Sequence, residues 1–200
     1  MFAPTRRKAL ILLASIGVPQ FAFSEGLGAG ERAVVAAYVD RLVELAKPAS
    51  KDLVLASMTT SFAGHQQGVP TLAELQADIP ETTPGTAQAF LGVNAAPLNL
   101  DLPGDVVAHW SHVRVVDQSM LSRFFEQPGP TDGWKRFYEE FPNASSLIQF
   151  SRVGIDDQAG QALFWMTVSS GMLSGASYLV LMEHRDGAWR PFKEKMLGIS

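Results

Sequence analysis

The sequence predicts an α+β fold: a curved antiparallel β-sheet of four to five strands, with helices packed on one face. Three observations carry this prediction. The last quarter of the chain holds four apolar, strand-like runs separated by turn signals, which indicates a meander. Residues 31–47 and 132–141 place apolar side chains at helical spacing. The length of 200 residues suits one such domain.

The meander is expected from Leu147 to the end of the chain, with turns at 157–160, 171–175 and 186–187. Its four strands are residues 147–155, 161–169, 177–185 and 189–199. Asp186-Gly187 is the strongest turn signal, because the preferred two-residue hairpin turn needs positive φ at both positions. Pro191 cannot donate to a ladder, so we expect the last strand at a sheet edge or at a bulge.

Both faces of the second strand are apolar. Its alternation puts Phe164 and Met166 on one face and Leu163 and Trp165 on the other. Either both faces are covered, or one of them lines a pocket. We therefore name Trp165, and Tyr178 on the next strand, as candidate pocket residues.

The chain before the meander offers several local signals. Thr71 and Glu74 form a capping box, which predicts a short helix through Asp78. Three further helices are expected: one that begins at Pro84, one capped by Ser119, and one over 132–141 with an aromatic stripe. A strand is expected over Val106–Val116. The stretch 51–62 is ambiguous, because it fits either a helix or a strand.

Residues 1–24 have the layout of a secretory signal peptide. Arg6, Arg7 and Lys8 precede the apolar run 9–18, and Ala22-Phe23-Ser24 is a small-residue cleavage site. A Sec signal is expected, and the paired arginines leave the twin-arginine route open. We expect residues 25–30 to be a linker and 31–200 to be one domain, with 31–104 mainly helical and 105–200 holding the sheet and two helices.

Composition excludes several function classes. The chain has no cysteine, so disulfides and thiol chemistry are absent. After removal of the signal, 13 basic residues face 20 acidic ones, a net charge of −7. Such an acidic surface argues against nucleic acid as a partner. No later apolar run is long enough for a transmembrane helix, so no integral membrane segment is expected after cleavage.

His109-x-x-His112 is the pattern that invites a metal site. On the predicted strand the two imidazoles point to opposite faces, and a zinc site needs more ligands than this pair offers. We therefore expect no metal and no cofactor. Serine catalysis lacks its elbow motif, because Gly171 to Gly175 has the serine one position out.

A set of residues spread over the last seventy positions carries a resemblance. It comprises Phe141-Pro142, Ser151-Arg152-Val153-Gly154, Gln161-Ala162-Leu163, Gly171, Gly175, Glu183, Gly187-x-Trp189 and Ile199-Ser200. Together they resemble a C-terminal module of exported bacterial proteins of unknown function. The resemblance implies the fold and export, and it carries no catalytic residue.

These observations favour a periplasmic or secreted, non-catalytic module that binds an unknown protein partner or a small apolar ligand. The alternative is a hydrolase-like enzyme that uses His109 or His112 with unidentified partners. A purely structural component of the cell envelope, or an accessory to another protein, is a third possibility that the residues leave open.

Overall fold

The computed structural model describes residues 26–46, 51–60, 69–94, 96–100, 102, 104–126 and 130–199. The predicted signal peptide, residues 1–24, lies outside the described residues. The described elements are α1 Ala29–Ala46, β1 Asp52–Ala56, α2 Leu72–Asp78, α3 Pro84–Val93, α4 Gly104–His109, β2 Val113–Val116, α5 Gln118–Phe125, α6 Pro130–Glu140, β3 Ala144–Phe150, β4 Gly154–Asp156, β5 Gln161–Gly171, β6 Ser174–Arg185 and β7 Ala188–Ile199.

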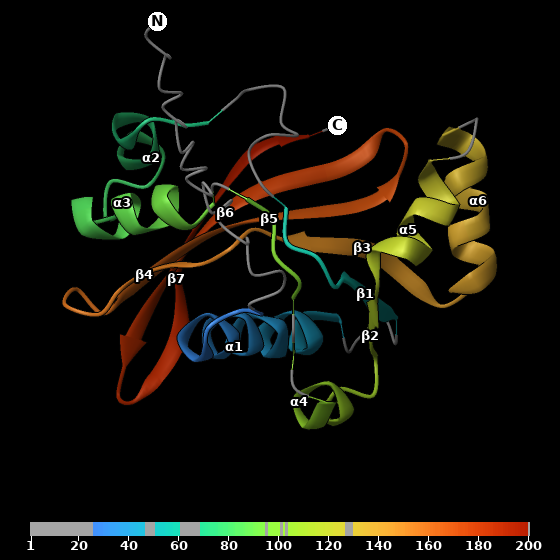
Figure 1. Ribbon diagram of the computed structural model, residues 1–200, viewed down its shortest axis with the longest axis horizontal. Helices are drawn as coiled ribbons and strands as arrows, with labels where there is room; N and C mark the ends of the chain where they lie inside the picture. The colour runs from blue at the N-terminus through green and yellow to red at the C-terminus, as the bar shows by residue number, and fades with distance from the viewer. Residues whose placement is uncertain are drawn as a thin grey trace, which may run out of the picture.

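The strands form one curved sheet in the order β2-β1-β3-β5-β6-β7, with β4 paired to β5 (Figure 1). The predicted α+β class is confirmed. The described sheet has seven strands, more than expected, and it is mixed: β1 runs parallel to β2 and to β3, while the later pairs are antiparallel. β1 lies within the ambiguous stretch 51–62, of which residues 61 and 62 are outside the described residues. It is an inner strand between β2 and β3, and Val54 and Leu55 are fully buried there.

Helices cover both faces of the sheet, and not one face as expected. α1 packs on the face that carries Phe164 and Val180, while α2 and α3 pack on the face that carries Leu163 and Leu181 (Figure 1). The physical reason is the apolar character of both faces of β5 and β6, since each apolar face must be removed from water.

α5 and α6 cover the β1 end of the sheet. Their aromatic side chains pack around Phe137, which is fully buried, and against Val54 and Val116. Ring pairs such as Trp134–Phe137 at 5.3 Å meet edge to face, a geometry that adds to the burial of apolar area. The aromatic stripe predicted for 132–141 therefore serves packing.

The predicted strand Val106–Val116 is wrong over its first half. Residues 104–109 form the short helix α4, and only Val113–Val116 is a strand. Alternation does not distinguish a helix of so few residues from a strand. Directly after α4, Trp110 Nε1 donates to Asp40 of α1 at 2.6 Å, which fastens the end of this segment to α1.

Three local assignments also change. Asp117, not Ser119, caps α5, because its Oδ1 accepts from the Met120 amide at 2.8 Å. The first strand of the meander is two strands, β3 and β4, interrupted at 151–153. The predicted linker 25–30 is shorter, since α1 begins at Ala29 and Leu27 is buried.

The strongest local signals are confirmed. The Thr71–Glu74 capping box is present, and Asp186 and Gly187 have φ values of 53° and 77°. Pro191 lies on the edge strand β7, next to a register shift in the β6–β7 ladder. No helix within the described residues has the length and apolar character that a membrane crossing requires.

Candidate interaction surface

The two candidate histidines are close in sequence but share no site. His109 ends α4 and is exposed. His112 lies in the turn before β2, half-exposed, with its Nδ1 3.2 Å from Asp52 Oδ1. No group of three or more histidines and carboxylates in the described part of the chain could hold a metal ion.

A serine also lies near Asp52, but not in a catalytic arrangement. Ser145 Oγ donates to the backbone carbonyl of Asp52 at 3.2 Å. Asp52 belongs to β1, which lies between β2, next to His112, and β3, which carries Ser145. In a nucleophile–base–acid set the imidazole must stand between the other two groups, and here the aspartate does.

The two candidate pocket residues lie on opposite faces of the sheet. Trp165 is 7% exposed and packs among Leu75, Ile79 and Phe90 of the α2–α3 layer, so side chains fill the space next to it. Tyr178 faces the α1 layer and is half-buried, directly opposite Met196 of β7.

Large apolar side chains are exposed at the far end of the β5–β6–β7 sheet. Leu173 in the β5–β6 turn is 81% exposed and Ile199 at the end of β7 is 78% exposed. Met172 is exposed beside Leu173, and Met196 precedes Ile199 on β7. The pairing of Ala176 with Ile199 brings the end of β7 close to the turn. We call Met172, Leu173, Met196 and Ile199 the apolar tip.

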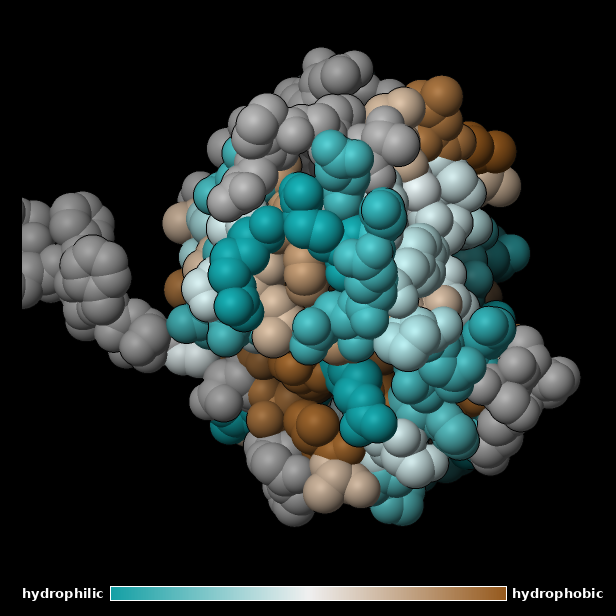
Figure 2. Space-filling view, turned by 90° about the vertical axis from the view of Figure 1, so that its right-hand side faces the viewer, coloured by the Kyte–Doolittle hydropathy of each residue, from teal (hydrophilic) through white to brown (hydrophobic). Residues whose placement is uncertain are grey.

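Figure 2 looks at the side of the molecule on which α5, α6 and the β5–β6 turn lie. Brown atoms gather at its upper right margin and in a second area lower down, with teal and pale atoms between them. Contiguous apolar surface on an otherwise polar face is typical of an interaction site.

Two clusters of buried polar groups in the described chain, by contrast, hold elements of the fold together. The Glu31 carboxylate of α1 accepts hydrogen bonds from Arg152 Nε at 3.1 Å and Nη2 at 2.9 Å. It also accepts from the backbone amides of Gly28 and Val153. At the end of α3, the Asn94 side chain accepts a hydrogen bond from the Arg152 backbone amide and donates one to the Arg152 backbone carbonyl. These bonds fasten α1 and α3 to the break between β3 and β4.

The residues of the Ser151–Gly154 motif each have a packing role. Ser151 Oγ accepts from the Trp165 amide at 2.8 Å, which continues the sheet across the break. Gly154 lies against the backbone of Phe90, where a Cβ would collide with main-chain atoms. The Ser151–Gly154 motif, which is part of the sequence resemblance, thus holds the β3–β4 break against β5 and α3.

A second polar cluster fixes the start of α3. Gln161 Oε1 accepts from the Thr83 amide at 3.0 Å and from Thr86 Oγ1 at 3.2 Å, while Asp156 accepts from Thr83 Oγ1 at 3.1 Å. Every donor here has its acceptor inside the protein, so the cluster offers no free group for chemistry.

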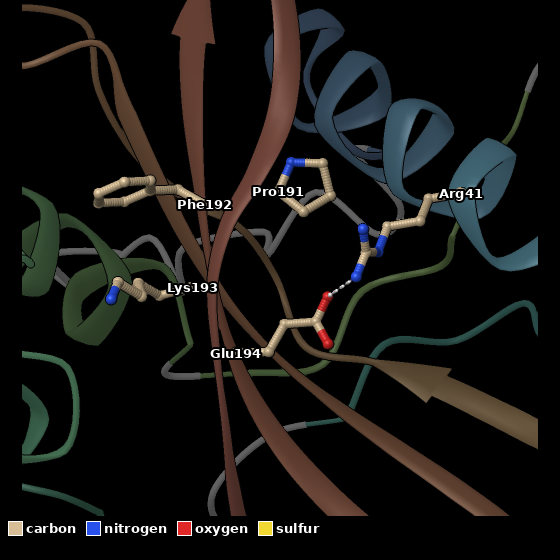
Figure 3. Close-up of a pocket in the computed structure, with 5 residues that line it drawn as sticks. All are labelled: Arg41, Pro191, Phe192, Lys193 and Glu194. Carbon is tan, nitrogen blue, oxygen red and sulfur yellow. Dashed lines mark ion pairs between the residues drawn. The ribbon is translucent and has the colours of Figure 1, made fainter. Parts of the chain in front are cut away.

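An open pocket of about 270 Å³ lies between α1 and the edge strand β7. Its lining residues are Arg41, Pro191, Phe192, Lys193 and Glu194. Figure 3 shows Phe192 and Lys193 on one side of β7 and Glu194 on the other, directed at Arg41. Arg41 and Glu194 form an ion pair at 3.1 Å, and Lys193 pairs with Glu81 at 2.9 Å.

Tyr38 lies in the core behind this pocket. Burial raises the pKa of its phenol well above the usual range, and the negative charge of Glu194 raises that pKa further. The phenol therefore stays protonated and acts as a packing group, in edge contact with Phe164 at 5.1 Å between ring centroids.

Comparison with protein-family models, with curated proteins and with solved structures found no match to the chain. The resemblance to a module of exported proteins therefore stays an expectation from the sequence.

The apolar tip was not predicted from the sequence, although the residues of the β5–β6 turn indicate it. Turn positions favour glycine, asparagine, aspartate, serine and proline. The β5–β6 connection instead places Met172 and Leu173 at its tip, flanked by Gly171 and Ser174. Two large apolar residues at such a position have no core to fill, so they indicate a surface contact.

Proposed function

We propose that this protein is an exported, non-catalytic interaction module that binds a protein partner through the apolar tip. The observation that carries the proposal is the exposure of Leu173 and Ile199 at one end of the sheet. Large apolar side chains exposed to water gain free energy when a partner surface buries them.

A protein partner is favoured over a small apolar ligand. A carrier of such ligands encloses them in an apolar cavity. The face of the sheet that holds Trp165 is covered by α2 and α3. The pocket beside β7 is open, and three of its five lining residues are charged. The side chains of the apolar tip are exposed at a turn and near a strand end, which suits contact with another protein.

The hydrolase alternative has less support. His112 contacts one carboxylate, that of Asp52. Ser145 lies on β3, and β1 with Asp52 stands between it and His112. A hydrolase reading predicts turnover of simple esters that His112→Ala or His109→Ala abolishes. Such a result would replace the present proposal.

The proposal is tested on the complex that the protein forms in its native envelope. The variant Leu173→Asp with Ile199→Asp places charges in the apolar tip, whereas Asp186→Asn changes the opposite end of the β6–β7 hairpin. We expect a large native complex, measured by size after mild extraction, that the double variant loses and Asp186→Asn keeps. A complex of unchanged size in both variants would contradict the proposal.

Export is part of the proposal and has its own measurement. We expect processing to remove residues 1–24, because a charged region, an apolar run and a small-residue site precede position 25. Mass spectrometry of the extracted protein should find a new N-terminus near Glu25. An intact N-terminus on protein recovered from the cytoplasm would contradict export.

A further inference from the structure

β7 differs from the rest of the protein in charge. Within β7, three basic residues, Arg190, Lys193 and Lys195, stand against one acidic residue, Glu194; over the whole β6–β7 hairpin the count is four basic to three acidic residues, because Glu183 and Asp186 are included with Arg185. β7 is therefore basic, while the remainder of the domain carries an excess of acidic residues. A local reversal of sign on an acidic protein favours a partner segment that is itself acidic.

β7 is also an edge strand, so one side of its backbone has no neighbouring strand within the described sheet. Residues that face each other across an antiparallel ladder alternate between hydrogen-bonded and non-hydrogen-bonded pairs. Counting from the two-residue turn at Asp186-Gly187, Pro191 falls in a non-hydrogen-bonded pair, which suits a residue without an N–H. The same alternation directs the backbone groups of Glu194 and Met196 away from β6.

Two register shifts divide β7. One lies beside Phe192 and the other beside Leu197, and between them Lys193–Met196 pairs regularly with β6. Bulges and a proline protect an edge from pairing along its whole length, as a second copy of β7 would do. The regular window between them remains long enough for a short strand.

The two faces of this window have different chemistry. Lys193 and Lys195 stand opposite Leu181 and Leu179, on the face covered by α2 and α3, where Lys193 also pairs with Glu81 at 2.9 Å. Met196 stands opposite Tyr178 on the α1 face. A strand added beside β7 would place alternate side chains next to the two lysines and next to Met196.

We infer that the outer edge of β7 binds an extended peptide segment in which acidic and apolar residues alternate. The segment adds to the sheet as a short strand, with its carboxylates beside Lys193 and Lys195 and its apolar side chains beside Met196. The pocket of about 270 Å³ along Pro191–Glu194 receives the end of the segment. This inference rests on the proposed interaction function and names the chemistry of one partner segment.

The test uses a labelled peptide of roughly eight residues that alternates glutamate and valine, the length of a short added strand. Its affinity is measured by fluorescence anisotropy against a peptide that alternates lysine and valine. We expect the glutamate peptide to bind at least about tenfold more tightly, and its affinity to fall as salt is raised. Equal affinity for the two peptides would overturn the inference.

Two pairs of variants separate strand addition from simple charge attraction. Met196→Pro removes an outward N–H, while Met196→Ala removes only the side chain; we expect the first to weaken binding at least about tenfold and the second far less. Lys195→Glu should weaken binding several-fold, whereas Lys135→Glu on α6 should not. Near-ultraviolet circular dichroism confirms that each variant is folded.

The outcomes distinguish this inference from the proposed function. If neither peptide binds while Leu173→Asp with Ile199→Asp still abolishes the native complex, the inference is wrong and the proposed function stands. If the purified protein self-associates and Met196→Pro abolishes that association, the edge pairs with a second copy and the inference is overturned.

Discussion

Arg152 and Glu31 form an ion pair across a separation of 121 residues, with the Arg152 Nη2 nitrogen 2.9 Å from Glu31 Oε2. The Glu31 side chain is 8% exposed and the Arg152 side chain 24% exposed. The pair joins the first helix to the break between β3 and β4. It therefore fastens α1 to the sheet at this break.

Glu31→Ala should destabilise the protein by about 3–5 kcal/mol, because it leaves Arg152 without its buried partner. Urea unfolding measures this change in the free energy of unfolding. Glu139→Ala, which removes a carboxylate from an exposed pair with Lys135 on α6, is the control and should stay within about 0.5 kcal/mol of wild type. Similar losses for both variants would contradict a structural role specific to Glu31.

Gly154→Ala should destabilise the protein by more than about 2 kcal/mol. A Cβ at this position meets the backbone nitrogen and Cα of Phe90, which cannot move without displacing α3. Gly92→Ala, in α3 itself, is the matched comparison: no atom lies within 4 Å of its added Cβ, and it should stabilise by up to about 1 kcal/mol. Thermal unfolding should show a lower melting temperature than wild type for Gly154→Ala and an equal or higher one for Gly92→Ala.

Gly187→Val should destabilise the β6–β7 hairpin by about 1–3 kcal/mol, because a β-branched residue resists the φ of 77°. Space is not the reason, since nothing lies within 4 Å of a Cβ there. Gly187→Asn should retain most of the stability, since asparagine tolerates positive φ. Equal stability of Gly187→Val and wild type would argue against this turn.

Tyr38 should make the protein less stable at alkaline pH. Burial and Glu194 raise the pKa of its phenol in the folded state above the unfolded value of about 10. Its contribution to stability is complete below that unfolded value and is lost as pH rises through the folded value. The free energy of unfolding of wild type relative to Tyr38→Phe, from urea unfolding, should therefore stay constant up to about pH 10 and fall above it. A constant difference would mean that Tyr38 ionises normally.

The sequence predicted most of the local elements whose signals are chemical and short in range. The Thr71 capping box, the Asp186-Gly187 turn and the alternation around Trp165 each depend on neighbouring residues. It did not predict that Val106–His109 would be helical or that β1 would enter the sheet parallel to β3, because those outcomes depend on contacts between distant segments.

The candidate functional residues also fall into those that the sequence indicated and those that only the fold revealed. His109 and His112 were conspicuous because of residue type, and the structure gives them separate surroundings. Ile199 was inconspicuous because an apolar residue in a strand is expected to be buried, and the signal at Leu173, a large apolar residue in a turn, was overlooked. Their significance comes from exposure, which only the fold determines.

The most direct test of the interaction function is site-specific photo-crosslinking in the native envelope. A photoreactive residue is placed at Leu173 in the apolar tip and, as a control, at Asp186 in the β6–β7 turn, which is also exposed. The account predicts a discrete crosslinked protein at position 173 that is absent at position 186. Crosslinks of equal yield at both positions, or none at position 173, would contradict it.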